Sequence, residues 1–120
     1  YPNRQVICFA GDGDFQMSSS ELGTAMQEGL NPIILIHNNG SYGTIRMHQE
    51  IRYPKRVSGT NLKNPNFKCI AEAYNFGFSK ITNLSEFKVA FEKAKTIDVG
   101  FIIEMLADIK DISPGKIIDL

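Results

Sequence analysis

Short apolar segments alternate with amphipathic ones along this chain, and this alternation restricts its fold more than any other feature. The apolar segments are Gln5–Ala10, Ile33–His37, Phe78–Thr82 and Gly100–Leu106. Between them, apolar residues recur three and four positions apart, as on a helix with one buried side. No Asn-Gly pair joins two apolar segments directly, as the turn of a hairpin would. The sequence therefore predicts an α/β fold, a parallel sheet with right-handed crossovers and helices on both faces.

Four helices are expected between the strands. They follow Ser18–Ser20, span Ser41–Glu50, begin near Asn66 and begin at Ser85. Serine hydroxyls can cap the first and the last of these helices. Asn31 and Pro32 are expected to end the first helix, because proline has no N–H to donate. Residues 51–65 are rich in Pro, Gly, Asn and Arg and are predicted to form a loop, and the tail from Asp108 has no strong pattern.

Length and charge exclude several classes of protein. The 120 residues fit one domain with a core of its own. The 13 basic and 13 acidic side chains balance, so neither nucleic acid nor a membrane surface is expected as a partner. The longest apolar run, Pro32–Ile36, is too short to span a bilayer, and we expect a cytoplasmic protein. In that compartment Cys8 and Cys69, both within apolar patterns, are predicted to be buried free thiols.

Two polar turns follow the first two predicted strands, namely Gly11–Gly13 and Asn38–Ser41. One helix separates the strands, so they can be neighbours, and their turns can meet at the edge of the sheet where ligands bind. The carboxylate of Asp12, the amide oxygen of Asn39 and a carbonyl near Ser41 are hard ligands of the kind that Mg²⁺ prefers. A diphosphate would complete the charge and coordination of the ion. Each turn alone is more often a plain turn than a site.

The two turns together carry a family resemblance. The string GDGDFQM…SELGTAMQEGLNPIILIHNNGSYGTIRMHQE resembles the thiamine-diphosphate-binding region of acetolactate synthases, benzoylformate decarboxylases and related enzymes. The likeness continues through YPKRVSGTNLKNPNFKCIAEAYNFGF and the ending DIKDISP, so it covers nearly the whole chain. It implies that residues 1–120 form a single, partial cofactor-binding domain of the PP type, at the C-terminal end of a longer enzyme. The start without Met, a few residues before a strand, is typical of the middle of a domain.

The resemblance also implies residue roles. It makes Asp12, Asn39 and the backbone carbonyl of Ser41 the ligands of Mg²⁺. It places thiamine diphosphate against Gly11, Gly13, Asp14, Tyr42, Gly43 and Ile45. Many relatives have a small neutral residue in place of Asp14, and a carboxylate beside a diphosphate is unfavourable unless it points away or pairs. Where pyruvate decarboxylases have an acid, Ile45 is aliphatic, as in carboligating or benzoylformate-type enzymes; the alternative is that Ile45 belongs to a helix core.

The implied activity is that of a lyase or transferase, a 2-oxo acid decarboxylase or carboligase. In this family an activating glutamate lies on a separate domain, so the catalytic residues are unknown and the chain alone is expected to be inactive. A homo-oligomer with a 2-oxo acid substrate is expected. Neither His37 nor His48 has a partner at catalytic spacing, and the basic residues of 46–56 suit a solvated loop. Two alternatives remain open: an inert structural or interaction module, and a receiver-like or flavodoxin-like domain with an acidic metal pocket.

Overall fold

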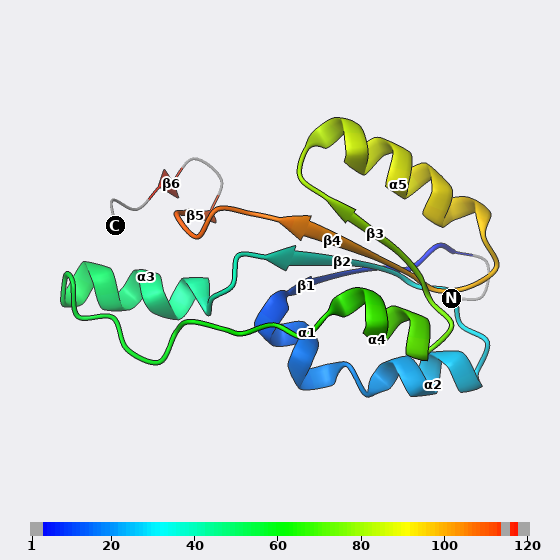
Figure 1. Cartoon of the computed structure of the whole chain (residues 1–120), viewed down its shortest axis with the longest axis horizontal. Helices are drawn as coiled ribbons and strands as arrows, with labels where there is room; N and C mark the ends of the chain where they lie inside the picture. Colours follow the sequence, from blue (N-terminus) through cyan, green and yellow to red (C-terminus); the bar gives the residue numbers. More distant parts are fainter. Residues whose placement is uncertain (1–3, 114–115, 118–120) are drawn as a thin grey trace.

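The computed structural model describes residues 4–113 and 116–117. Strands and helices alternate along most of the chain (Figure 1). Their bounds are β1 (Ile7–Gly11), α1 (Asp12–Ser18), α2 (Glu21–Gln27), β2 (Ile33–Asn38), α3 (Gly43–Arg52), α4 (Phe67–Ala73), β3 (Gly77–Ile81), α5 (Leu84–Thr96), β4 (Phe101–Leu106), β5 (Asp111–Ser113) and β6 (Lys116–Ile117). In the described part of the chain, no helix is long and apolar enough to cross a membrane.

Four strands form one parallel sheet in the order β1-β2-β4-β3. The central strands β2 and β4 pair in register from Ile33 opposite Phe101 to Asn38 opposite Leu106. The strands β5 and β6 form a separate antiparallel pair, and β5 contacts α3 (Figure 1). The predicted parallel α/β sheet is confirmed.

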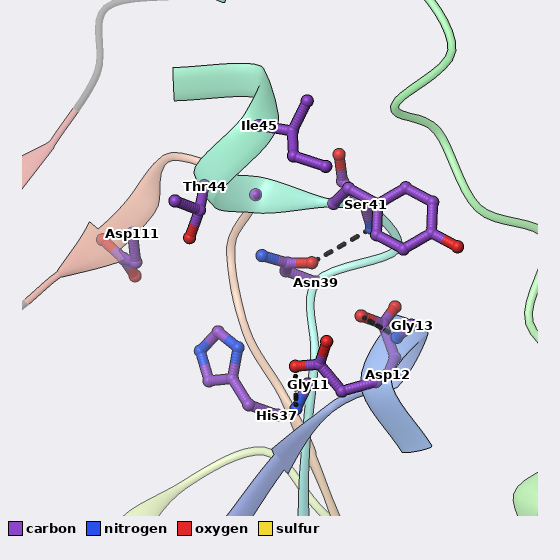
Figure 2. Close-up of a pocket in the computed structure, with 12 residues that line it drawn as sticks. Gly11, Asp12, Gly13, His37, Asn39, Ser41, Thr44, Ile45 and Asp111 are labelled. Atoms are coloured by element: carbon purple, nitrogen blue, oxygen red, sulfur yellow. Dashed lines mark hydrogen bonds between the residues drawn. The ribbon is translucent and has the colours of Figure 1, made fainter. Parts of the chain in front are cut away.

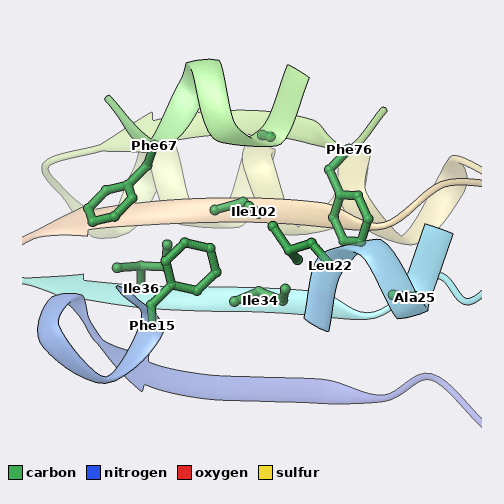
Figure 3. Close-up of a cluster of buried hydrophobic side chains, with 9 residues drawn as sticks. Phe15, Leu22, Ala25, Ile34, Ile36, Phe67, Phe76 and Ile102 are labelled. Carbon is green, nitrogen blue, oxygen red and sulfur yellow. The ribbon is translucent and has the colours of Figure 1, made fainter. Parts of the chain in front are cut away.

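Helices cover both faces of the sheet, as predicted. On one face α1, α2 and α4 surround a cluster that includes Phe15, Leu22 and Phe67 (Figure 3). The rings of Phe15 and Phe67 meet edge to face, with centroids 5.5 Å apart. On the other face α5 packs through Ala90 and Ala94 against a second cluster. Because side chains alternate along a strand, consecutive residues of β2 and β4 contribute to opposite clusters.

The segment after β1 differs from the prediction, which had a turn there. Helix α1 begins at Asp12, directly after the strand, and ends at Ser18, with Ser19 as its C-cap. Ser20 occupies the N-cap position of α2 but makes no side-chain cap bond. That helix ends at Gln27, earlier than expected, because Gly29 adopts a left-handed conformation (φ 62°) before Pro32 is reached.

The other helices agree with the sequence more closely. Asn66 caps α4, since its side chain accepts from the backbone N–H groups of Lys68 and Cys69. The predicted cap of α5 is wrong: the side chain of Asn83, rather than that of Ser85, accepts from the backbone N–H of Glu86 at 3.0 Å. Ser85 already lies within the first turn of the helix.

The prediction of two buried thiols is wrong, because Cys8 and Cys69 are both exposed. Cys8 belongs to β1, an edge strand that is mostly exposed, and in the same strand Phe9 is 77% exposed. Cys69 lies on α4 between the buried residues Phe67 and Ala71, on the outward side of the helix. An apolar pattern does not show that a strand lies at the edge of its sheet.

Candidate functional site

A pocket of about 220 Å³ lies beyond the carboxyl ends of β1 and β2 (Figure 2). The end of β1 and the first turn of α1 form one side of it. The turn after β2 and the first turn of α3 form the other side. The lining residues are Gly11, Asp12, Gly13, Asp14, His37, Asn39, Ser41, Tyr42, Gly43, Thr44, Ile45 and Asp111.

The structure brings together all nine residues that the sequence singled out for a metal or a cofactor, since each of them lines this pocket. Three further residues complete the lining: His37, Thr44 and Asp111. His37 is the last residue but one of β2, next to the polar turn, a position that could have indicated it. Asp111 comes from the tail segment DIKDISP, which shares the family resemblance but was assigned no role.

Asp12 is the buried centre of the site, with 1% of its surface exposed. Its Oδ1 accepts from the N–H of Gly13 at 3.1 Å. Its Oδ2 accepts from the N–H of Gly40 at 2.9 Å and from Nδ2 of Asn64 at 2.5 Å. Among the described residues, no Lys or Arg pairs with this carboxylate. A buried carboxylate that is surrounded only by neutral donors favours a cation.

The turn after β2 supplies two more oxygen atoms beside Asp12 (Figure 2). The N–H of Ser41 donates to Oδ1 of Asn39 at 3.0 Å, which orients that amide. Ser41 is itself buried, and its hydroxyl donates to the carbonyl of Thr60 at 2.9 Å. Gly40 allows the turn because it adopts a left-handed conformation (φ 66°). The turn therefore brings Asn39 and Ser41 into the lining of the same pocket as Asp12.

Two glycines make room for these groups. A Cβ at Gly13 would lie 2.5 Å from the ring of Tyr42, which packs over this position. A Cβ at Gly43 would lie 2.8 Å from Nδ2 of Asn39. Real Cβ atoms do not come so close to other heavy atoms, so larger residues at these positions would displace the ring or the amide.

A carboxylate beside a diphosphate is unfavourable unless it points away or pairs, and Asp14 pairs with the backbone. Its Oδ2 accepts from the backbone N–H of Gly11 at 3.2 Å, and the residue is exposed. The carboxylate therefore pairs with the backbone at the mouth of the pocket. Ile45 is 53% exposed, and α3 buries none of its residues. The alternative that Ile45 belongs to a helix core is wrong.

Sequence reasoning missed a chain of polar side chains next to the pocket. Nδ2 of Asn38 donates to Oε1 of Glu104 at 2.7 Å, and Glu104 is buried. The ammonium group of Lys80 lies 3.3 Å from the same oxygen. On the other side, Oδ1 of Asn38 accepts from Nδ2 of Asn64 at 2.8 Å. These residues come from four distant segments, so no local spacing indicates that they meet.

Among the described residues, no three His, Cys, Asp or Glu side chains gather as a metal-binding group. This disfavours the acidic pocket of a receiver-like or flavodoxin-like domain, which needs several carboxylates. The donor set is instead one carboxylate and neutral oxygens, which suits a magnesium ion that shares its coordination with a phosphate.

An open parallel sheet with a polar pocket beyond its strand ends defines an α/β ligand-binding domain. The family model for the C-terminal thiamine pyrophosphate-binding domain of thiamine pyrophosphate enzymes matches residues 1–105. The chain belongs to this family, and the resemblance seen in the sequence is confirmed.

Its relatives include acetolactate synthases. The chain is 38% identical to the acetolactate synthase large subunit of Buchnera aphidicola over 107 residues, which cover 85% of this chain and 19% of that protein. It is 31% identical to the isozyme 2 large subunit of Escherichia coli, over 89% of this chain and 20% of that protein. The chain thus spans about a fifth of the length of these relatives.

Solved structures of decarboxylases have the same fold. The thiamine diphosphate-dependent 4-hydroxybenzoylformate decarboxylase of Rhodococcus jostii superimposes with a TM-score of 0.82 at 30% identity, over 89% of this chain and 20% of that one. The benzoylformate decarboxylase of Polynucleobacter necessarius gives a TM-score of 0.83 at 24% identity, over 99% of this chain and 21% of that one, which supports the fold alone.

Proposed function

We propose that this chain is the Mg²⁺- and thiamine-diphosphate-binding part of a 2-oxo acid decarboxylase or carboligase. The observation that carries the proposal is the buried carboxylate of Asp12, which has neutral donors around it and no cationic partner among the described residues. A carboxylate offers about four lone pairs, and three donors occupy three of them here. One lone pair is left for a metal ion.

The remaining ligands would come from the turn after β2. Asn39 and Ser41 line the same pocket as Asp12 and offer two neutral oxygens, the side-chain amide oxygen of Asn39 and the backbone carbonyl of Ser41. One carboxylate leaves a divalent ion with excess positive charge, which a diphosphate would neutralise. We propose Asp12, Asn39 and Ser41 as the metal ligands for this reason.

The diphosphate would lie beside Gly11 and Gly13, which line the pocket and carry no side chain that would keep a phosphate away from the backbone. Tyr42, Gly43 and Ile45 would pack against the rest of the cofactor, since they line the same pocket. Asp14 would stay compatible with a nearby anion through its bond to the N–H of Gly11. When bound, thiamine diphosphate supplies the stabilised carbanion that decarboxylation of a 2-oxo acid requires.

We further propose that residues 1–120 form part of a cofactor domain in a longer, cytoplasmic, homo-oligomeric enzyme, and that the chain alone is inactive. The support is that the chain spans about a fifth of its relatives and leaves much of β1 exposed. The substrate class, a 2-oxo acid, is proposed by analogy with the similar 4-hydroxybenzoylformate decarboxylase and not from any residue in the pocket.

The test measures binding by the complete polypeptide that carries this chain. Isothermal titration with Mg²⁺ in the presence of thiamine diphosphate should show saturable binding, and Asp12→Ala should abolish it. A matched control is Asp98→Ala, which removes an exposed carboxylate that does not line the pocket. Wild-type protein that binds neither Mg²⁺ nor thiamine diphosphate would overturn the proposal and favour an inert structural or interaction module.

A further inference from the structure

Asn64 lies in the loop between α3 and α4 and reaches the two strand ends that form the site. Its Nδ2 donates to Oδ2 of Asp12 at 2.5 Å and to Oδ1 of Asn38 at 2.8 Å. Its own Oδ1 accepts from Nε2 of Gln16 at 2.8 Å. One side chain, 52 residues from Asp12, thus uses both of its amide hydrogens at the ends of β1 and β2.

The hydrogen-bonding groups around Asn64 fix its orientation. Glu104, paired with Lys80, can only accept a hydrogen bond, so Asn38 must present its NH₂ group to it. Oδ1 of Asn38 then faces Asn64 and also accepts from the N–H of Gly40 at 3.1 Å. Asn64 must therefore present its own NH₂ group to Asn38 and Asp12. The carboxylate of Glu104 thus orients the amide of Asn38, and the carboxylate of Asp12 helps to orient the amide of Asn64.

This arrangement makes the two oxygens of Asp12 unequal. Oδ2 accepts from Gly40 and Asn64, whereas Oδ1 accepts from Gly13 alone. Since each oxygen has about two lone pairs, Oδ2 is saturated and Oδ1 keeps one free. We propose that Asn64 is a positioning residue that saturates Oδ2, so that Asp12 presents Oδ1 to the cation. This inference rests on the proposed function.

The loop that carries Asn64 is attached to the turn after β2 as well. The N–H of Leu62 donates to the carbonyl of Gly40 at 2.8 Å, and the N–H of Tyr42 donates to the carbonyl of Thr60 at 2.9 Å. The Ser41 hydroxyl donates to that same carbonyl. The backbone of the loop is therefore held against the turn after β2 independently of the side chain of Asn64. Removing its amide should disturb the carboxylate without releasing the loop.

The test uses Mn²⁺, detected by electron paramagnetic resonance, as the probe for the cation site of the complete polypeptide with thiamine diphosphate present. Asn64→Leu keeps the side-chain volume and removes both donors. Loss of an outer partner of a metal ligand typically weakens metal affinity about 10- to 100-fold, and we expect the Mn²⁺ dissociation constant to rise by that factor. The matched control is Asn61→Leu in the same loop, whose side chain contacts Arg46 and not Asp12. Its Mn²⁺ affinity should equal that of the wild type.

A second variant keeps the inference testable if Asn64→Leu fails to fold. Gln16→Leu leaves Asn64 in place and removes the donor to its Oδ1. We expect a smaller loss of Mn²⁺ affinity in the same direction. Thermal melting of the metal-free proteins separates a general loss of stability from the effect on the site. A lower melting temperature with unchanged Mn²⁺ affinity would overturn the inference, because it would show a structural role only. Wild-type protein that binds no Mn²⁺ would instead overturn the proposed function, and this inference with it.

Discussion

The carboxylate of Asp12 accepts a hydrogen bond from the backbone N–H of Gly40, which lies 28 residues further along the chain. The bond joins the end of β1 to the turn after β2, so the proposed metal ligand also holds the two halves of the pocket together. A substitution of Asp12 therefore has two separable effects, one on the folded chain and one on ligand binding.

Replacement of Asp12 by Ala should destabilise the protein even without metal. The N–H of Gly13 loses its acceptor, the N–H of Gly40 and the amide of Asn64 keep only Asn38, and loss of such buried hydrogen bonds costs about 1–3 kcal/mol. Urea unfolding of metal-free protein measures this loss of unfolding free energy. Asp14→Ala, which removes an exposed carboxylate, should cost less. Equal stability of Asp12→Ala and wild type would contradict the role of Asp12 in joining the strand ends.

Substitution of Gly43 by Ala should weaken Mg²⁺ binding through Asn39. The new Cβ would lie 2.8 Å from the Asn39 amide nitrogen, so the amide must move. Overpacking of this kind costs about 1–3 kcal/mol where neighbours cannot adjust. Isothermal titration in the presence of thiamine diphosphate measures the change. Gly23→Ala on α2, whose Cβ would make an ordinary 3.5 Å contact with Tyr74, should leave the affinity unchanged.

Protonation of Glu86 in acid should lower the unfolding free energy of the protein. The backbone N–H of Thr82, and then its hydroxyl, donate to the carboxylate and hold the pKa of Glu86 below its ordinary value of 4.5. Stability from a lowered pKa is present above the unfolded value and is lost as the pH falls through the folded one. The unfolding free energy should therefore fall less steeply with acidification below pH 4.5 in Glu86→Gln than in wild type. A titration of Glu86 by NMR that gives an ordinary pKa would refute this.

The 120-residue chain should self-associate through the edge strand β1. Ile7 and Phe9 project from the same face of that strand, and Phe9 is 77% exposed. Exposed apolar patches tend to find partners. Light scattering should show oligomers that decrease in Phe9→Lys. Val89→Lys on α5, at a site that is 73% exposed, is the control and should associate like wild type. A monomeric wild-type chain at high concentration would contradict the prediction.

The same isolated chain should not convert 2-oxo acids, because the glutamate that the family resemblance places on another domain is not among its residues. The assay measures decarboxylation of several 2-oxo acids with saturating Mg²⁺ and thiamine diphosphate. Turnover by the wild-type chain that disappears in Asp12→Ala would show that these residues suffice for catalysis.

Local patterns predicted the strands and the arrangement of the pocket. The central strands β2 and β4 have continuous apolar runs because they are mostly buried on both faces, whereas the edge strands β1 and β3 are only partly buried. The Gly-Asp-Gly and Asn-Asn-Gly-Ser segments meet because parallel strands end at one edge. The predicted residues line one pocket as a result, while their roles toward metal and cofactor stay proposals.

Features that depend on distant contacts were not predicted. Helix α1 looked like a turn because Gly11 and Gly13 are poor helix formers, yet packing of Phe15 against the core stabilises it. Asn64 and Glu104 gave no signal, since their partners come from other parts of the chain. The exposure of Cys8 depends on strand order, which the apolar pattern does not contain.

The strand order also dictates when the site can be completed as the chain is synthesised. Asp12, Asn39 and Ser41 emerge from the ribosome before β3 and β4, and β1 and β2 can then pair. Strand β4 occupies the centre of the sheet but is translated after β3, and Glu104 lies 66 residues beyond Asn38. Until then one edge of β2 stays unpaired and the Asn38 amide lacks the carboxylate that orients it. A ribosome stalled before Phe101 would hold a nascent chain that has every proposed ligand but not yet the carboxylate that orients the amide of Asn38.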